Sequence, residues 1–348
     1  MNIKIIFAKI NYKVVSFMKI LVTGPDGVLG SNIVRELLSR DHEVSVLLFD
    51  EEKPSITLDG LAIKRFYGNI VNADDMDKCI EGQDVVIHAA ASTSVFPARN
   101  PIVNKVNIDG TENVIDACLK HKVGRMIYVG TANSFGYGSE EVPGKEGNPY
   151  LSARYGVDYM DSKQKAQEIV LDAVKAKGLQ AIVVNPTFMI GPFDSRPSSG
   201  AMVLAVHHGK IPGYSAGGKN FIAVKDAATA ISNAVTMGTI GECYILGNRN
   251  LTYQAAFNMI AETISGKKVT RRLPNFVVKA YGSMNSFFAK LFKYYPGVTK
   301  ELAIISCERH YYSPEKARKE IGLPETPIEE AIQECFDWFK ENGYLDKK

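Results

Sequence analysis

Short apolar runs alternate with amphipathic stretches along the chain from Met18 onward. Runs such as "KILVTG", "HEVSVLLF", "DVVIHAAA" and "GRMIYVGTA" have the length and the β-branched content of buried strands. Between them, stretches such as "SNIVRELLSR" repeat apolar residues three and four positions apart, which predicts helices. Strands that alternate with helices predict βαβ units, and therefore an α/β fold built on a doubly wound parallel sheet.

The alternation stops after "NPTFMIGPFDSRPSSG", where Pro, Ser and Gly cluster and later segments mix helices with irregular stretches. We expect residues 18–187 to form the doubly wound domain, with a return segment at about 220–250. Residues 188–348 are expected to form mainly a smaller mixed lobe, and residues 1–17 an N-terminal extension.

The extension, "MNIKIIFAKINYKVVSF", is apolar and basic, so a targeting sequence has to be weighed against a plain upstream segment. Lys4, Lys9 and Lys13 interrupt every apolar run, and no small-residue cleavage site follows, which favours the plain segment. No stretch approaches the ~20 uninterrupted apolar residues of a membrane span.

"VTGPDGVLGS" spaces Gly24, Gly27 and Gly30 three positions apart, directly after the first expected strand and at the start of the first expected helix. Glycine permits the tight turn, lets backbone approach a pyrophosphate and keeps the helix close to the sheet. The helix N-terminus adds free N–H groups and the positive end of its dipole. The alternative is a plain turn, but the place between strand and helix favours dinucleotide binding in a Rossmann-type domain.

The second expected strand ends "LLFDEEK", where the residue that contacts the adenosine ribose belongs. Asp50 lies about where an acid would favour the 2′-hydroxyl of NAD, whereas Lys53 could reach the 2′-phosphate of NADP. These residues leave NAD and NADP both open.

Composition argues against several classes of function. Lys+Arg 41 against Asp+Glu 38 gives a formal charge of +3, so no strong attraction to nucleic acid is expected. The five cysteines are scattered, with no Cys-x-x-Cys pair, which argues against a disulfide scaffold and a zinc site. We therefore expect no metal and a soluble protein of the reducing cytoplasm.

Residues 153–166, "ARYGVDYMDSKQKA", hold Tyr155, Tyr159 and Lys163, each four positions from the next. On a helix these side chains would share one face, with Cβ atoms about 5–6 Å apart. Either the amphipathic stems stack there, or the lysine favours phenolate and makes a neighbouring tyrosine an acid–base group. The three residues alone leave both interpretations open.

Together these stretches resemble the extended short-chain dehydrogenase/reductase family, within the NAD-dependent epimerase/dehydratase superfamily. The resemblance is to the dihydroflavonol reductase-like and 3β-hydroxysteroid dehydrogenase-like members and covers nearly the whole chain from Met18. The matching stretches are "TGPDGVLG", "GNI" at 68–70, "HAAA" at 88–91, "NIDGTENV" at 107–114, Tyr159-x-x-x-Lys163 and "NPTFMIGP" at 185–192.

The resemblance implies four catalytic residues. Tyr159 would be the proton donor or acceptor, and Lys163 would lower its pKa and hold the nicotinamide ribose. Thr131 would bond the substrate oxygen, and Asn107 would support the active-site helix and a water chain. Tyr155 receives no role from the resemblance, so we expect it to pack near the substrate or in the core with its hydroxyl satisfied.

The resemblance also implies a cofactor-binding set. Asn69 and Ile70 would flank the adenine, and small side chains at 89–91 would leave room for the nicotinamide half. Phe49 stands where many reductase-like members have an arginine, which weakens the inference of NADP. The full expected set is Gly24, Gly27, Val28, Leu29, Gly30, Asp50, Asn69, Ile70, Ala89, Ala90, Ala91, Tyr159, Lys163 and Pro186.

The implied activity is an NAD(P)-dependent oxidoreductase that interconverts a ketone and a secondary alcohol on an apolar small molecule. The main alternative is an NAD-dependent nucleotide-sugar epimerase, but many epimerases read Arg-Tyr-Phe-Asn where this chain reads "NPTF". Sugar-nucleotide dehydratases usually follow the threonine with Asp-Glu, and here Ala132-Asn133 follows Thr131. A non-catalytic dinucleotide sensor is a third alternative, although such proteins often lose the tyrosine or lysine that this chain retains.

Residues 276–295, "FVVKAYGSMNSFFAKLFKYY", place apolar side chains at helical spacing together with three lysines. A membrane-surface helix has this pattern, but soluble proteins use such stripes chiefly for burial. We therefore expect this helix to cover an apolar substrate pocket, without membrane contact. Dimers through a helix pair are common in the family that the chain resembles, so a homodimer is also an expectation from the resemblance.

Overall fold

The computed structural model describes residues 17–52 and 55–346. The predictions for Lys53 and for residues 1–16 of the extension lie outside the described residues. Within the described part, no helix is both long enough and apolar enough to cross a bilayer.

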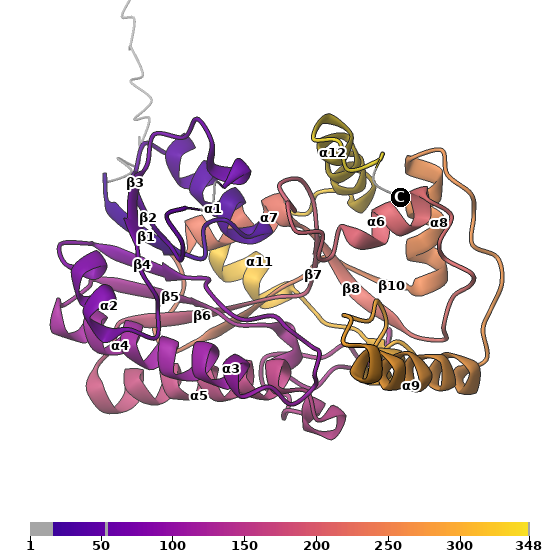
Figure 1. The fold of residues 1–348 in the computed structure, drawn as a ribbon. Coiled ribbons are helices and arrows are strands. Elements are labelled where there is room, and N and C mark those ends of the chain that lie inside the picture. Colours follow the sequence, from indigo (N-terminus) through magenta and orange to yellow (C-terminus); the bar gives the residue numbers. More distant parts are fainter. Residues whose placement is uncertain (1–16, 53–54, 347–348) are drawn as a thin grey trace, which may run out of the picture.

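A seven-stranded sheet forms the larger half of the molecule (Figure 1). Its strands lie in the order β3-β2-β1-β4-β5-β6-β9, and every neighbouring pair is parallel. β2 and β3 are added on one side of β1 and β4 on the other, so the strand order reverses between β1 and β4. In such sheets, ligands bind outside the carboxyl ends of the strands at that point. The strands are β1 (Lys19–Thr23), β2 (Glu43–Leu48), β3 (Lys64–Tyr67), β4 (Val85–His88), β5 (Arg125–Val129), β6 (Ala181–Pro186) and β9 (Cys243–Leu246).

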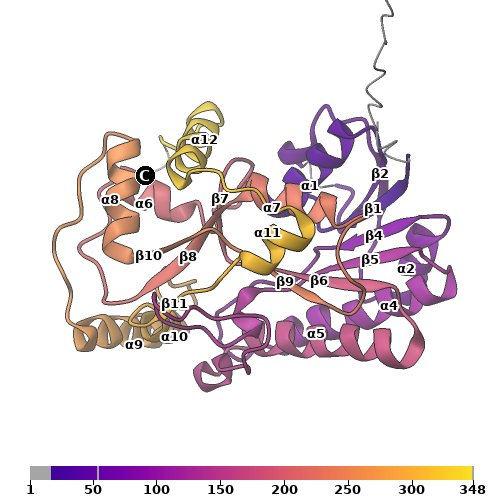
Figure 2. The ribbon, with the colours of Figure 1, turned by 180° about the vertical axis from the view of Figure 1, so that it is seen from behind.

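Helices cover both faces of this sheet, so the prediction of a doubly wound α/β fold is confirmed (Figures 1 and 2). One face packs against α1 (Val28–Ser39), α7 (Val224–Asn233) and α11 (Glu315–Ile321). The other face packs against α2 (Ala73–Ile80), α4 (Gly110–Lys120) and α5 (Asp158–Lys177). Because both faces are buried, the central strands are continuous apolar runs rather than alternating ones.

A second, smaller sheet forms the other lobe. Its strand β8 (Gly218–Ala223) pairs antiparallel with β10 (Arg249–Thr252), and successive parts of it pair in parallel with β11 (Arg309–His310) and β7 (Phe188–Ile190). Its apolar cluster is closed by α6 (Ala201–His207), α8 (Tyr253–Thr263) and α12 (Ile328–Glu341).

The chain crosses between the lobes more than once. After β8, α7 and β9 return to the large sheet, inside the range where a return segment is expected, and α11 packs there as well. The two sheets are therefore tied together by segments far apart in the sequence, and the carboxyl ends of β1, β4 and β5 face the small lobe (Figure 1).

Helix α9 (Asn275–Phe292) contradicts the prediction that its apolar stripe is buried. Its buried residues are the small ones, Gly282, Ser286 and Ala289. Of these, Gly282 and Ser286 contact α10 (Lys300–Ile305). The large apolar side chains of the predicted stripe are exposed. The pattern has the right period, but the small face of the helix is the one that packs.

Candidate active site

The glycine-rich loop between β1 and α1 is closely packed at two of its three glycines. Gly24 has a φ of +67°, and a Cβ there would lie 2.7 Å from the backbone nitrogen of Ala90. A Cβ on Gly30 would lie 2.1 Å from the carbonyl oxygen of Gly24. Gly27 differs, because a Cβ there would meet only that same oxygen, at 3.7 Å. The loop therefore presents open backbone at Gly27, where α1 begins, as a bound pyrophosphate requires.

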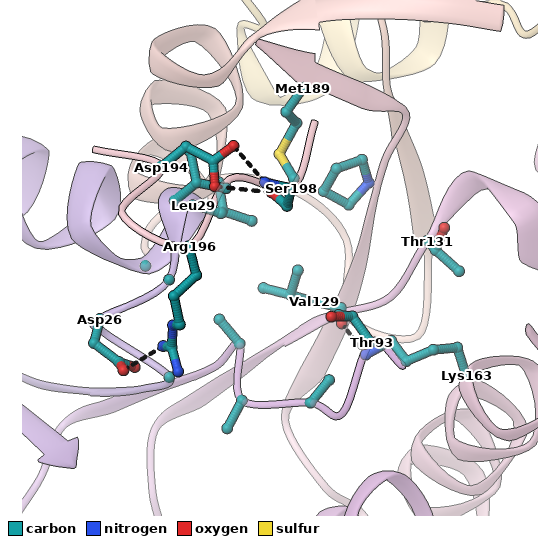
Figure 3. Close-up of a pocket in the computed structure, with 18 of the residues that line it drawn as sticks. Asp26, Leu29, Thr93, Val129, Thr131, Lys163, Met189, Asp194, Arg196 and Ser198 are labelled. Atoms are coloured by element: carbon teal, nitrogen blue, oxygen red, sulfur yellow. Dashed lines mark hydrogen bonds and ion pairs between the residues drawn. The ribbon is translucent and has the colours of Figure 1, made fainter. Parts of the chain in front are cut away.

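This loop forms one wall of a cavity of about 490 Å³ (Figure 3). The opposite walls come from the residues that follow β4, β5 and β6, so the cavity lies at the carboxyl edge of the sheet. The predicted residues that line it are Gly24, Gly27, Val28, Leu29, Gly30, Ala89, Ala90, Ala91, Thr131, Tyr159, Lys163 and Pro186. Open backbone and small side chains at these positions fit a nicotinamide dinucleotide.

Three residues expected on the adenine side, Asp50, Asn69 and Ile70, do not line this cavity. The Asn69 N–H donates to Asp75 Oδ2 at 2.9 Å, and its Oδ1 accepts from Val71 N at 3.1 Å. Ile70 is buried against Gly110 of α4. Their assignment to the adenine stays a prediction.

Lys163 is buried beneath the cavity at the end of β5. Its Nζ donates to the carbonyl oxygen of Val129 at 2.5 Å and lies 4.4 Å from the centre of the Tyr128 ring. Burial lowers the pKa of Lys163 to about 7, because no carboxylate among the described residues compensates its charge.

Tyr159, one turn before Lys163, faces the cavity together with Thr131, which follows β5. Burial raises the pKa of the Tyr159 phenol, and a hydrogen bond with the Thr131 side chain acts in the opposite direction. Lys163 does not contribute to the pKa of the phenol in this structure, so the expected lowering by Lys163 stays a prediction. The phenol is neutral near pH 7.

Asn107 connects the segment after β4 to α5 through hydrogen bonds of its side chain. It lies in a π-helical turn, Lys105–Asp109, after the short helix α3 (Pro101–Asn104). Its side chain accepts from Ser92 N at 2.7 Å, and its Nδ2 donates to Ser92 O at 3.0 Å and to Ser162 Oγ at 2.9 Å. Asn107 therefore fixes the segment after β4 against α5, beside Tyr159 and Lys163.

Tyr155 does not share the helix face of Tyr159 and Lys163, so that part of the prediction is wrong. It ends a 3₁₀ turn, Ser152–Tyr155, and Gly156 in the left-handed region separates that turn from α5. The prediction of a satisfied hydroxyl is confirmed, because the Tyr155 hydroxyl bonds Glu308 at 2.8 Å and His310 Nε2 at 3.1 Å.

The loop between β7 and α6 supplies cavity residues that the sequence did not indicate. Asp194 is buried and accepts from Ser198 N at 2.8 Å and from Gly200 N at 2.9 Å, which shapes the loop. Arg196 then reaches across the cavity to Asp26 of the glycine-rich loop, with 2.5 Å between Nη2 and Oδ2 (Figure 3). The Pro-Ser-Gly cluster at 195–200 was the available signal, but it indicates only a loop.

A second cavity of about 230 Å³ adjoins the first, and Thr131, Tyr159, Pro186 and Thr187 line both. Its remaining walls come from distant parts of the chain and are mostly apolar. They are Val95, Ala132, Asn133, Met160, Phe188, Lys219, Asn220, Leu302, Ile305, His310 and Tyr312. The phenol and the threonine hydroxyl therefore stand where the two cavities meet.

Lys219 is the one lysine among the residues that line this second cavity. Its Nζ lies 4.7 Å from the centre of the Phe188 ring, and no described carboxylate forms an ion pair with it. Burial lowers the pKa of Lys219 to about 8. His310, its neighbour on β11, has its pKa lowered to about 3 by burial and by Lys219, so it is neutral.

Comparison with known proteins places this geometry in a family. A family model described as "NAD dependent epimerase/dehydratase family" matches residues 20–247. The chain is 27% identical over 330 residues to a putative dihydroflavonol 4-reductase of Synechocystis, covering 93% of this chain and 95% of that protein. It is also 27% identical to the decarboxylating sterol-4-alpha-carboxylate 3-dehydrogenase of Candida albicans, over 94% of this chain and 99% of the other.

A 2-alkyl-3-oxoalkanoate reductase of Stenotrophomonas maltophilia is 26% identical, over 91% of this chain and 98% of the other. Among solved structures, a protein named gox2253 superposes with a TM-score of 0.81 at 29% identity, covering 94% of this chain and 99% of that one. An NAD complex of the UDP-glucose 4-epimerase of Thermus thermophilus superposes with a TM-score of 0.73 at 20% identity, covering 93% and 99%. The latter likeness concerns the fold alone.

Proposed function

This chain belongs to the NAD dependent epimerase/dehydratase family, and from that membership we propose that it is an NAD(P)-dependent oxidoreductase that interconverts a ketone and a secondary alcohol on an apolar small molecule. One observation carries the proposal: Tyr159 and Thr131 line both cavities, so an acid–base group stands between a dinucleotide site and an apolar chamber.

The chain's own residues would bind, orient and move a proton. A bound nicotinamide dinucleotide supplies or accepts hydride. Open backbone at Gly27 and the N-terminus of α1 would hold the pyrophosphate, and Lys163 would hold the nicotinamide ribose. Thr131 would donate a hydrogen bond to the substrate oxygen as charge develops there. Tyr159 would give its proton to that oxygen in reduction and accept it back in oxidation.

Reduction would start from the protonated Tyr159 phenol, which is the form of a proton donor. Burial raises the pKa of this phenol and so favours its protonated form. Oxidation would need the phenolate, and a charged Lys163 or another nearby cation would have to offset the cost of burial.

The second cavity supports a substrate that carries a carboxylate beside its apolar body. Val95, Met160 and Phe188 offer apolar contact, whereas Lys219 offers a cation without a carboxylate partner among the described residues. Lys219 is half-buried, and a cation in apolar surroundings is stabilised when an opposite charge pairs with it. Two relatives bear names with such substrates, a 2-alkyl-3-oxoalkanoate and a sterol-4-alpha-carboxylate.

The epimerase alternative has less support from the same cavity. Asn185, where many epimerases have an arginine, is buried and donates to Thr131 O at 3.1 Å and to Gln167 Oε1 at 2.7 Å. Phe188, where they have an asparagine, packs edge-on against Phe221 with ring centres 5.3 Å apart. Neither residue offers a donor to the diphosphate of a sugar nucleotide.

The test is a fluorescence titration of the purified full chain with NADH and NADPH, followed by an absorbance assay. The panel holds long-chain 3-oxo acids, their methyl esters, the matching ketones without a carboxylate, and UDP-sugars. Oxidation of the dinucleotide that depends on a ketone would support the reductase. Binding without oxidation, with interconversion of UDP-sugars, would establish the epimerase instead, and binding without any turnover would favour a sensor.

A further inference from the structure

Eleven of the eighteen exposed large apolar side chains of the described chain lie on α9 and the residues after it, and we define them as the α9 face. Every large apolar side chain of the predicted stripe lies on it, and two of the most exposed are Phe287 at 64% and Phe292 at 68%. The face consists of Phe276, Val277, Tyr281, Met284, Phe287, Phe288, Leu291, Phe292, Tyr294, Tyr295 and Val298. Exposed apolar patches of this extent mark interaction sites.

The packing of α9 explains why these side chains point outward. Gly282 faces α10 so closely that a Cβ would lie 2.5 Å from the Ala303 Cβ and 2.8 Å from the Thr299 carbonyl oxygen. Ser286 accepts a hydrogen bond from Lys300 N at 2.8 Å. Because small residues make the inward contact, turning the helix would replace them with phenylalanines that have no room. The outward direction of the aromatic face is therefore built into the fold.

The positive charge of the segment around α9 indicates which kind of partner can cover the α9 face. Between Glu262 and Glu301 the chain has eight basic residues and no acidic one. That segment therefore carries +8, and since the whole chain carries +3, the remainder carries −5. The eight are Lys267, Lys268, Arg271, Arg272, Lys279, Lys290, Lys293 and Lys300, and all are exposed. An apolar helix face flanked by lysines is the pattern of a helix that lies in the interface of an anionic bilayer.

The same charges disfavour two other candidates for covering the α9 face, which are a second copy of the chain and the N-terminal extension. A second copy of the chain would bring a face of equal positive charge against this one. The N-terminal extension carries Lys4, Lys9 and Lys13 and no acid, so it also has the same sign. β1, the first strand after the extension in the sequence, lies in the large lobe, whereas α9 lies on the small lobe (Figure 1).

We propose that the α9 face binds the surface of membranes that contain anionic phospholipid. The α9 face lies next to the second cavity, so membrane binding would bring an apolar substrate close to the proposed active site. Leu302 and Ile305 of α10 line that cavity, and α10 packs on α9. Val95 also lines the cavity, while the adjacent Phe96 lines a groove of about 460 Å³ beside Tyr295. An apolar substrate dissolved in the bilayer would therefore meet the enzyme one helix away from Tyr159.

The experiment is flotation of the full chain with vesicles of phosphatidylcholine alone and with one quarter phosphatidylglycerol, at 50 mM and 500 mM NaCl. We expect binding to the anionic vesicles at low salt, at least tenfold weaker binding at high salt, and little binding to phosphatidylcholine. Equal binding to both lipids, or binding to neither, would overturn the proposal. No cofactor or substrate is present, so the result is independent of the proposed reaction.

Two pairs of variants locate the site. Phe287→Ser with Phe292→Ser should reduce the vesicle partition at least tenfold, because two apolar anchors are lost. Lys290→Glu with Lys293→Glu should reduce it at least about twenty-fivefold, at roughly fivefold for each lysine whose attraction is lost. The matched controls are Ile102→Ser, an apolar residue 67% exposed on α3, and Lys165→Glu with Lys175→Glu on α5.

Three further results would overturn the proposal. The controls could reduce binding as much as the α9 variants, which would show a general effect of charge or of apolar surface. A triple variant of the extension, Lys4→Glu with Lys9→Glu and Lys13→Glu, could abolish binding while the α9 variants retain it, which would move the site to the extension. Sedimentation could show a dimer that Phe287→Ser with Phe292→Ser dissociates, which would make the face an interface between copies.

Discussion

The two adjoining cavities are built in different ways. The first is lined mainly by the glycine-rich loop and by the residues that follow three neighbouring strands, and the small lobe adds Met189 and the loop at 194–198. The second is lined by large side chains from segments as far apart as Val95 and Tyr312. The shape of the first cavity depends mainly on the local sequence and on the large sheet. The shape of the second cavity depends on how the small lobe packs. Changes in the two cavities should therefore affect different steps.

Tyr159→Phe is expected to have the largest effect, because this residue belongs to both cavities. Loss of the phenol removes the proton donor, so kcat should fall by about 10²–10⁴-fold, while the Kd of NAD(P)H changes by less than about threefold. Stopped-flow turnover and a fluorescence titration measure the two quantities. Tyr155→Phe is the matched control, since its hydroxyl bonds Glu308 and lines neither cavity. An equal fall of kcat in the control would remove Tyr159 from its role.

Gly27→Ala tests the first cavity alone. The added Cβ meets only the Gly24 oxygen at 3.7 Å, so the melting temperature should barely change. The methyl group would nevertheless stand where a pyrophosphate approaches, so the Kd of NAD(P)H should rise by about 10–100-fold. Gly147→Ala serves as control, because a Cβ there meets nothing within 4 Å. Unchanged dinucleotide affinity would sink the assignment of the loop.

Lys219→Met tests the second cavity alone. The variant keeps the length of the side chain and removes its charge, so KM for a 3-oxo acid should rise by about 10–100-fold. KM for the methyl ester and the Kd of NAD(P)H should stay within about threefold. Should acid and ester respond alike, Lys219 would have a structural role only.

The smallest expected effect is on the free energy of unfolding, and it comes from two buried histidines. Substituting each one compares the packing beside the two cavities. His88 lies beneath the first cavity, with Nδ1 2.8 Å from Thr23 Oγ1, and His310 lies in the wall of the second. Burial lowers the pKa of each from 6.5 to about 3. Between these values the unfolded chain binds a proton that the folded chain does not, so the free energy of unfolding should decrease as the pH falls from 6.5 toward 3.

The decrease should be at most about 1.4 kcal/mol per pH unit for each histidine. Urea denaturation at pH 7, 6 and 5 measures it, and His88→Gln and His310→Gln should each lessen the slope. If only His88→Gln does so, water reaches His310 in the folded protein, and the second cavity is looser than the first.

Much of the large lobe was predictable, because its elements follow from local patterns. Buried parallel strands are continuous apolar runs, and the spacing of Gly24, Gly27 and Gly30 between strand and helix is legible in the sequence. The residues near Tyr159 were predictable only through the resemblance, since spacing alone left two interpretations open. The prediction that Tyr155 shares a helix face with Tyr159 was wrong, because Gly156 adopts a left-handed conformation. That conformation ends the 3₁₀ turn of Tyr155 before α5 begins.

The sequence by itself determined the doubly wound fold, the glycine-rich loop and the periodicity of α9, because each depends on contacts between residues close in the chain or on the burial of a strand. Only the tertiary structure decided that Lys219 shares a cavity with Tyr159, that Arg196 reaches Asp26, and that α9 turns its small face inward. These outcomes depend on which surfaces meet after folding. A helical pattern records which residues share a face, but the partner that fits that face is encoded elsewhere in the chain.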